Sequence, residues 1–487
     1  MHTSLVAGVD CSTQATKVAL VDAETGRIVG IGRASHVVAG DGGARESDPR
    51  GWWTALERAL AAAVAAGGDR RDIVAISVAG QQHGLVVLDA RGDPLRDAPL
   101  WNDTRSAPDA ERLTAELGAE TWADRTGLRP VASFTVTKWA WLRRTQPSLA
   151  AAVAAVRLPH DYLTERLTGI GVTDRGDVSG TGWWSTRDEQ YDARILGLPG
   201  VELPVRLLPE VLGPVDRAGT VSPGVAAALG LRPDVVVGPG TGDNMGAALG
   251  LGLAVGQPAL SLGTSGTAFA VSAVRPTDPS GTVAGFCDAS GRFLPLAATL
   301  NCTLAVERVA TWLGIDREDV EPAREVVVLP YLDGERTPDL PTAAGRISGL
   351  RHATSRQEIL MATYEGAALS LLDALDAIAV QAAGLASDRP LVLVGGGARG
   401  RAWREVVRRL SGRAVLVPDA DELVALGAAV QAAAVRWGEQ PGAVAARWRT
   451  SRGTLLDPLP RDDDRLGRIR AARDAVVREA QRDAAIG

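Results

Sequence analysis

The sequence has 487 residues, 46% of them hydrophobic and 23% charged, which is a globular composition too long for a single core. A formal net charge of −6 without a long Lys/Arg block argues against nucleic acid or an anionic membrane as a partner. The three cysteines, Cys11, Cys287 and Cys302, lack the spacing of a disulfide framework or a zinc site. With no export signal and no apolar run long enough to span a bilayer, we expect a soluble, cytoplasmic protein of two domains.

The first part of the chain alternates apolar and polar residues in short runs that are separated by turn residues. This pattern predicts a three-strand meander with strands at 5–9, 17–21 and 28–34. Asp48 and Pro49 then open a helix whose apolar stripe includes Trp52 and Trp53. The next predicted elements are strands at 73–79 and 86–88 and helices at 136–142 and 149–156.

A second copy of the opening design begins near Gly256. Strand 259–262, the turn 263–266 and strand 267–271 repeat strand 6–9, the turn 10–13 and strand 17–21. Later, a buried strand at 391–394 leads into a glycine turn and a helix from about Arg401, and an amphipathic helix is predicted around 464–483. Because strands and helices alternate, the fold class is α/β, and the repeat predicts two turns that face each other across a cleft.

Residues 235–244 form an apolar strand that enters a glycine turn and ends in Asp243 and Asn244. Glycines in this turn permit positive φ and a close approach of ligand to backbone. The small residues that follow begin a helix whose N-terminus favours anions. Asp243 is therefore our candidate catalytic base, and the alternative is a plain strand-to-helix turn with a capping aspartate.

The two repeated turns are rich in backbone N–H groups and hydroxyls, which can wrap phosphate oxygens. Ser, Thr and Gly also dominate turns that bind nothing, but recurrence in both half-copies favours the phosphate function. The candidate phosphate contacts are Thr13, Lys17, Gly263, Thr264 and Thr267. Lys17 and Lys138 are the only lysines, and neither completes a Walker A motif.

Three further features each allow two or more interpretations. Residues 395–400 match Gly-x-Gly-x-x-Gly, which fits a dinucleotide site, a tight turn, or glycines against which a nucleotide ring lies. Asp10 ends the first strand and would hold Mg²⁺ through water or cap the turn. His83 follows Gln82 after a strand end, a suitable place for hydrogen bonds to a polyol and equally for a structural histidine.

The sequence resembles the FGGY family of carbohydrate kinases along nearly the whole chain. The resemblance depends on five segments in this order: 10–17, 82–83, 242–244, 262–266 and 395–399. Segments 329–338 and 345–350 are also similar to family sequences. Three further stretches look more like those of family members that phosphorylate D-xylulose than like those of glycerol kinases. They are segments 80–84 and 101–105, and Phe134-Thr135 with Lys138. Two departures are His160, where a lysine is common, and Cys11-Ser12 within the first turn.

The resemblance implies an α/β fold of two ribonuclease-H-like domains, as in actin and hexokinase, with ATP and sugar in the cleft. The corresponding segments are an N-terminal domain at 1–247, a C-terminal domain at 248–440 and a helical extension at 441–487. The implied reaction is phosphorylation of D-xylulose to D-xylulose 5-phosphate with ATP and Mg²⁺. Alternatives are a kinase of another ketose or polyol, such as ribulose, a deoxy-ketose or glycerol, and a catalytically silent sugar sensor.

The resemblance also implies the functions of individual residues. Asp243 is the general base, and Gln82, His83 and Asn244 contact the sugar. Gly396, Gly397 and Arg399 lie on the adenosine side, and Asp10 serves Mg²⁺. The expected partner is a small-molecule sugar, and a homodimer is possible.

Overall fold

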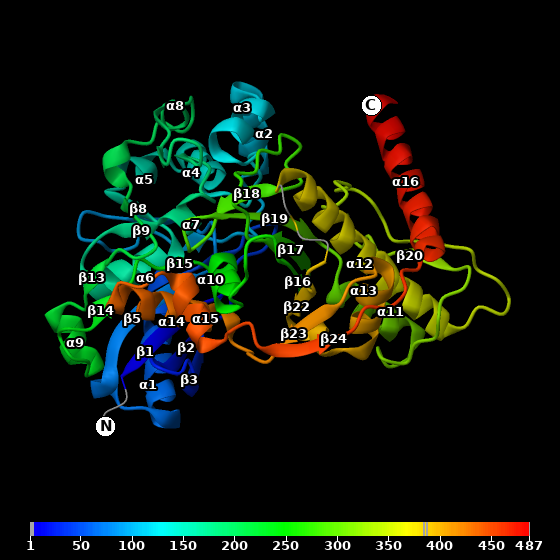
Figure 1. Ribbon diagram of the computed structural model, residues 1–487. Helices are drawn as coiled ribbons and strands as arrows, with labels where there is room; N and C mark the ends of the chain where they lie inside the picture. The colour runs from blue at the N-terminus through cyan, green and yellow to red at the C-terminus, as the bar shows by residue number, and fades with distance from the viewer. Residues whose placement is uncertain (1–3, 383–384, 386–387, 487) are drawn as a thin grey trace.

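The structure, a computed structural model, describes residues 4–382, 385 and 388–486. Residues 1–3 of the predicted N-terminal domain and residue 487 of the predicted helical extension therefore lie outside the described residues. Figure 1 shows two lobes side by side, each built around its own sheet. The α/β class and the two-domain organisation are confirmed. No helix within the described ranges is long and apolar enough to cross a bilayer.

The N-terminal sheet has the strand order β13-β14-β5-β1-β2-β3, with β15 also paired to β5. Its strands are β1 (Leu5–Cys11), β2 (Ala15–Asp22), β3 (Ile28–Ser35), β5 (Ile73–Gly80), β13 (Gly219–Thr220), β14 (Val236–Val237) and β15 (Thr241–Gly242). Strand β2 pairs antiparallel with both β1 and β3, which confirms the predicted meander. Strand β1 pairs parallel with β5, so the carboxyl ends of β1 and β5 lie at the same edge of the sheet.

The C-terminal sheet has the order β18-β19-β17-β16-β22-β23-β24. Its strands are β16 (Pro258–Leu262), β17 (Gly266–Ala270), β18 (Ala284–Cys287), β19 (Phe293–Thr299), β22 (Leu391–Val394), β23 (Val415–Pro418) and β24 (Gly453–Leu456). Strand β16 pairs antiparallel with β17 and parallel with β22. This is the pattern of β1 with β2 and β5, so the half-copy relation predicted from the sequence holds in the topology.

Glycines let helices lie directly on the N-terminal sheet. Helix α1 (Pro49–Gly67) begins after its cap Asp48, whose side chain accepts a hydrogen bond from the Arg50 N–H at 2.9 Å. The helix packs on β3 so closely that a Cβ on Gly32 would strike the helix backbone. Helix α14 (Leu423–Trp437) packs on β1 and β5 from the other side. Helix α10 (Asp243–Gly250) packs in turn on α14, so the helix that begins at Asp243 has a rigid support.

The remaining elements surround the two sheets. The other helices are α2 (Ala107–Leu117), α3 (Ala119–Thr126), α4 (Thr135–Thr145), α5 (Pro147–Ala152), α6 (Pro159–Thr168), α7 (Arg175–Val178), α8 (Ala193–Leu196), α9 (Pro223–Leu229), α11 (Thr303–Leu313), α12 (Arg356–Gln381), α13 (Arg401–Ser411), α15 (Pro441–Trp448) and α16 (Asp463–Ile486). The short strands are β4 (Glu46–Ser47), β6 (Val86–Leu88), β7 (Ala98–Pro99), β8 (Ala155–Arg157), β9 (Val172–Asp174), β10 (Trp184–Ser185), β11 (Gln190–Tyr191), β12 (Glu210–Leu212), β20 (Val327–Leu329) and β21 (Arg346–Ser348). Short 3₁₀ turns occupy Arg70–Asp72, Val205–Leu207 and Gly396–Arg399.

The predicted helix at 149–156 is only half correct. Helix α5 ends at Ala152, and Ala155–Arg157 forms strand β8, which pairs antiparallel with β6. Alanine favours a helix locally, but pairing with β6 buries Val156 and Arg157, and this tertiary contact overrides the helix propensity.

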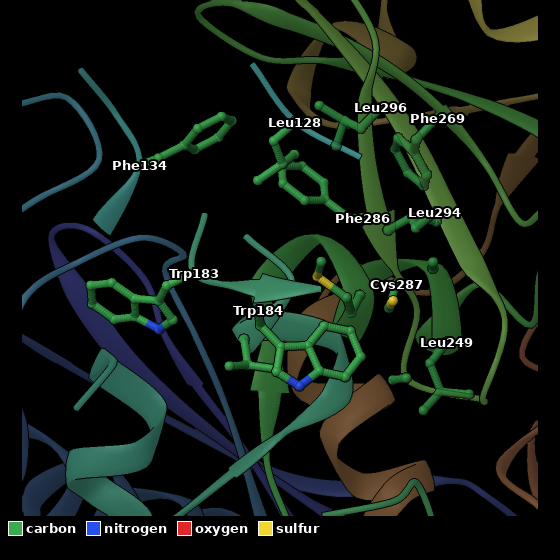
Figure 2. Packing of buried hydrophobic residues seen from close by; sticks show 14 of the residues in the cluster. Leu128, Phe134, Trp183, Trp184, Leu249, Phe269, Phe286, Cys287, Leu294 and Leu296 are labelled. Carbon is green, nitrogen blue, oxygen red and sulfur yellow. The ribbon is translucent and has the colours of Figure 1, made fainter. Parts of the chain in front are cut away.

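The two lobes share one hydrophobic cluster, which Figure 2 shows from close by. Phe134 and Trp183 belong to the N-terminal half, and Phe286 and Leu294 to the C-terminal sheet. The Phe134 and Phe286 rings lie 6.2 Å apart in an edge-to-face arrangement. The backbone N–H of Cys287 also donates to Ser179 Oγ at 2.9 Å, so β18 is a direct contact between the lobes.

Candidate active site

Asp243 lies where β15 passes into α10. The glycine turn before it is required by packing, because Gly240 has φ +81° and a Cβ there would meet Val78 O at 2.8 Å and strike the His160 ring. Gly242 occupies the N-cap position of α10, so Asp243 is the first helical residue rather than the cap. Its Oδ1 accepts from the backbone N–H of Asn244 at 2.9 Å.

The electrostatic surroundings make the Asp243 carboxyl unusually basic. Burial and then the negative charge of Asp10 raise its pKa to about 7, although the backbone N–H of Asn244 lowers it in part. The side chain is half-buried rather than fully enclosed, so a ligand can reach it. A carboxyl with this pKa suits a group that accepts a proton at neutral pH.

Two amide side chains connect Asp243 to β5. Asn244 Nδ2 donates to Asp243 Oδ1 at 3.2 Å and to Gln82 Oε1 at 2.8 Å. Gln82 Nε2 in turn donates to Asp177 Oδ1 at 3.4 Å. The structure therefore brings together Asp243, Asn244 and Gln82, as the sequence predicts, and adds Asp177, which sequence reasoning did not single out.

His83 follows Gln82 in an uncommon backbone conformation, with φ +68°. Its ring lies 5.0 Å from the Phe134 ring and 5.6 Å from the Phe286 ring, so both lobes enclose it. Burial, together with the nearby charge of Lys138, lowers its pKa to about 3, and the imidazole is neutral at physiological pH. Its Nδ1 is buried without a hydrogen-bond partner in the described structure, which leaves this atom available to a ligand.

Asp10 and Lys17 lie opposite each other on the β1–β2 hairpin. Lys17 Nζ is 3.6 Å from Asp10 Oδ2 and 2.7 Å from Glu422 Oε2, so its charge faces two carboxylates. Burial raises the pKa of Asp10 to about 6, against the lowering effect of Lys17. Asp10 Oδ1 is buried and has no hydrogen-bond partner among the described atoms.

This orphaned oxygen bears on the implied Mg²⁺. An unpaired buried carboxyl oxygen fits an ion that keeps most of its water and needs only one or two carboxylates. Within the described residues, no group of three or more His, Cys, Asp or Glu side chains is placed to hold a metal ion. The donor set at Asp10 therefore fits a hydrated Mg²⁺ and nothing more elaborate.

The first hairpin turn is closed by its own backbone and is contacted by a residue of segment 101–105. Ser12 N–H donates to Ala15 O at 3.0 Å, which closes the turn. Trp101 Nε1 donates to Thr13 Oγ1 at 3.1 Å. Glu422, which accepts a hydrogen bond from Lys17, was not predicted from the sequence.

The second hairpin turn lies against the glycine turn after β22. A Cβ on Gly397 would lie 2.8 Å from both Leu262 Cβ and Thr303 Cγ2, so these segments touch. Thr303, at the start of α11, donates to Gly263 O at 2.7 Å. Gly396 has open space where a Cβ would be, and Thr264 is exposed.

The structure thus groups the nucleotide-side candidates of the C-terminal lobe in one place. The group consists of Gly263, Thr264, Thr267, Gly396, Gly397 and Arg399. Thr267 lies on β17, directly after the turn, and is half-buried. Arg399 is exposed and pairs with the exposed Asp421.

Comparison with known proteins identifies the family of the chain. The N-terminal domain of the FGGY family of carbohydrate kinases matches residues 5–250, and the C-terminal domain of the family matches residues 259–435. Xylulose kinase of Streptomyces coelicolor is 58% identical over 99% of this chain and 98% of its own, and that of Streptomyces rubiginosus is 57% identical over 96% and 95%. The crystal structure of xylulose kinase from Bifidobacterium adolescentis is 35% identical, with a TM-score of 0.82 over 97% of this chain and 99% of that one. The chain therefore belongs to the FGGY family of carbohydrate kinases and is a sugar kinase with the two-domain, actin- and hexokinase-like fold.

Proposed function

We propose that the protein transfers the γ-phosphoryl group of ATP to the 5-hydroxyl of D-xylulose, with Asp243 as the general base. The observation that supports this proposal most directly is the half-buried Asp243 carboxyl, which is hydrogen-bonded to Asn244 and has a pKa raised to about 7. The similarity to relatives named xylulose kinase supports the choice of sugar. The hydrogen-bonding amides beside Asp243 suit a polyhydroxylated substrate.

The sugar side of the reaction uses the N-terminal residues. Gln82, His83 and Asn244 hold the ketose so that its 5-hydroxyl oxygen faces the γ-phosphorus. As that oxygen forms its bond to phosphorus, Asp243 accepts the hydroxyl proton and the bond to the ADP oxygen breaks. Phosphoryl transfer needs mainly alignment and charge stabilisation, so a single well-placed base is sufficient.

The nucleotide side uses the two hairpin turns and the second glycine turn. Backbone N–H groups and hydroxyls hold the phosphates, from Thr13, Gly263, Thr264 and Thr267. Gly396, Gly397 and Arg399 border the adenosine, where Gly396 offers open space for a flat ring. Bound Mg²⁺ would neutralise phosphate charge. Asp10 would hold the ion, and Lys17 keeps Asp10 in place from the same hairpin.

The proposed domain division remains 1–247, 248–440 and 441–487. Helices α14 and α15 belong to the last two segments by sequence, and both pack against elements of the N-terminal lobe. Their position links the end of the chain to the lobe that carries Asp243. A cytoplasmic location and a homodimer remain predictions.

A sugar panel tests the proposal. The protein is assayed for ADP release with MgATP and equal concentrations of D-xylulose, D-ribulose, a deoxy-ketose, gluconate and glycerol. We expect kcat/KM for D-xylulose to exceed every other value by at least about tenfold. A higher value for another sugar would reassign the substrate, and no ADP release with any of them would remove the kinase function itself.

A further inference from the structure

A buried polar cluster lies directly beneath the turn that carries Asp243, and the reaction described above does not use it. Its centre is His160, at the start of α6. The Nε2 atom of His160 lies 3.1 Å from Asp161 Oδ1, 3.5 Å from Asp174 Oδ1 and 3.4 Å from Asp177 Oδ2. All four side chains are buried, and burying these polar groups lowers the free energy of unfolding.

The cluster is fastened to the Asp243 turn. Thr241, two residues before Asp243, donates its hydroxyl to Asp174 Oδ2 at 2.8 Å. Asp174 also accepts from the backbone N–H groups of Gly176 and Asp177, each at 2.8 Å, and thereby caps α7. Helix α7 and strand β15 are therefore held at a fixed distance, with the His160 ring packed below Gly240.

From this cluster, Asp177 extends a chain of hydrogen bonds to the base. Its Oδ1 accepts from Gln82 Nε2, which turns Gln82 Oε1 towards Asn244 Nδ2. A carboxyl oxygen in this position favours one of the two orientations of the Gln82 amide. Both hydrogens of Asn244 Nδ2 are then used, one on Gln82 and one on Asp243, so Asn244 Oδ1 is left as the free acceptor.

We propose that Asp177 is a positioning residue for the phosphoryl transfer: it orients the amides of Gln82 and Asn244, so that a ketose hydroxyl donates to Asn244 Oδ1 while Asn244 Nδ2 holds Asp243. The inference rests on the proposed function of this site and deepens it. Without an acceptor at position 177, the Gln82 amide can rotate, its NH₂ group then faces that of Asn244, and the contact to Asp243 is weakened.

The charge of Asp177 decides which variant preserves the arrangement. Burial and the neighbouring carboxylates of Asp174 and Asp161 raise its pKa well above the ordinary value, which favours the neutral form of the side chain. Asparagine has the same shape, is neutral and retains a carbonyl oxygen. Leucine has a similar volume and no acceptor.

The experiment compares Asp177→Leu with Asp177→Asn in the full-length enzyme. We expect Asp177→Leu to lower kcat/KM for D-xylulose at least about tenfold, with the KM for ATP within about twofold of wild type. Asp177→Asn should retain kcat/KM for D-xylulose within about threefold. The matched control is Asp192→Asn, another buried aspartate that caps α8 and pairs with Arg125, and it should lower the melting temperature without changing the KM of either substrate.

Folded Asp177→Leu with wild-type ketose kinetics would overturn the proposal, and so would an Asp177→Asn variant as impaired as Asp177→Leu. If Asp177→Leu does not fold, a neutron structure of the wild-type enzyme with the ketose decides the point. A sugar hydroxyl on Asn244 Oδ1, with Gln82 Nε2 towards Asp177, supports the proposal, and reversed amides contradict it. Failure of the proposed function is recognised separately, because the wild-type enzyme would then not turn over the ketose.

Discussion

The N-terminal and C-terminal halves of the candidate site consist of different chemical groups. The N-terminal half consists of buried and half-buried side chains: a carboxyl with a pKa of about 7, two amides, and a neutral histidine between aromatic rings. The C-terminal half consists of glycines, hydroxyls and exposed backbone. Proton transfer and sugar recognition depend on individual side-chain atoms, whereas phosphates are held by backbone groups that survive sequence change. The difference predicts that substitutions in the first half affect chemistry and those in the second affect ATP binding.

The largest effect is expected from Asp243→Asn. This change removes the proposed proton acceptor but keeps the shape and the hydrogen bond to Asn244, so kcat should fall by about a thousandfold or more while D-xylulose still binds. Steady-state kinetics and calorimetric titration of the sugar measure the two quantities. A purified variant that keeps a substantial share of wild-type turnover would show that Asp243 is not the base.

Asp10→Asn should come next, with kcat lowered by about a hundredfold, because the carboxyl that we propose serves Mg²⁺ is lost. The same change removes a negative charge that raises the pKa of Asp243. The low-pH limb of the rate profile should therefore move to lower pH in this variant. Titration of the rate with Mg²⁺ at several pH values tests both points, and an unchanged Mg²⁺ requirement would exclude Asp10 from the metal site.

Gly397→Val probes the C-terminal half. The added side chain meets Leu262 and Thr303 at 2.8 Å and displaces the second phosphate turn, so the KM for ATP should rise about tenfold with the KM for D-xylulose unchanged. Gly442→Ala is the control, because its Cβ would have nothing within 4 Å, and it should leave both constants unchanged. Equal changes in both KM values for Gly397→Val would remove the distinction between the halves.

The pH dependence should follow Asp243. The base must be ionised, so kcat/KM for the ketose should fall about tenfold per pH unit below about 7. The contribution of Asp243 to the free energy of unfolding depends on pH in the opposite direction. The pKa of this carboxyl is raised above its ordinary 3.8, so its contribution is present at low pH and is lost as the pH rises through about 7. Melting temperatures of wild type and Asp243→Asn should therefore diverge in favour of the variant as the pH rises from about 4 to about 7 and keep a constant difference above that, and parallel curves between pH 4 and pH 7 would contradict the raised pKa.

The smallest effect is expected at the surface of the C-terminal half. Arg399 and Asp421 form an ion pair with both side chains about 70% exposed. Exposed pairs are screened by water and salt, so Asp421→Ala should change the free energy of unfolding by less than about 1 kcal/mol. Denaturant unfolding measures this value. A loss of several kcal/mol would mean that this lobe also depends on fixed side chains.

Local patterns were sufficient to predict much of the molecule. The strands around the two hairpin turns and the glycine turn before Asp243 follow from alternation, glycine and capping residues, and the structure has them. Contacts between distant segments were not predictable. Lys17 meets Glu422, 405 residues away, and Ala155–Arg157 became a strand because β6 was available.

Asp177 illustrates the same limit within the site. It lies on a helix of four residues without a recognisable motif, and its importance arises only from the contact to Gln82. The one signal in the sequence was a pair of carboxylates three residues apart, Asp174 and Asp177, after a short apolar strand. His160, noted as a departure from the family, lies in the same cluster.

The most direct test of the account is the structure of the product. Wild-type protein is incubated with MgATP and D-xylulose, and the sugar phosphate is examined by proton-detected ³¹P NMR. We expect one product, with phosphorus coupled to the two protons on carbon 5 and formed in equal amount to ADP. Phosphate on another carbon, or ADP and free phosphate without a sugar phosphate, would contradict it.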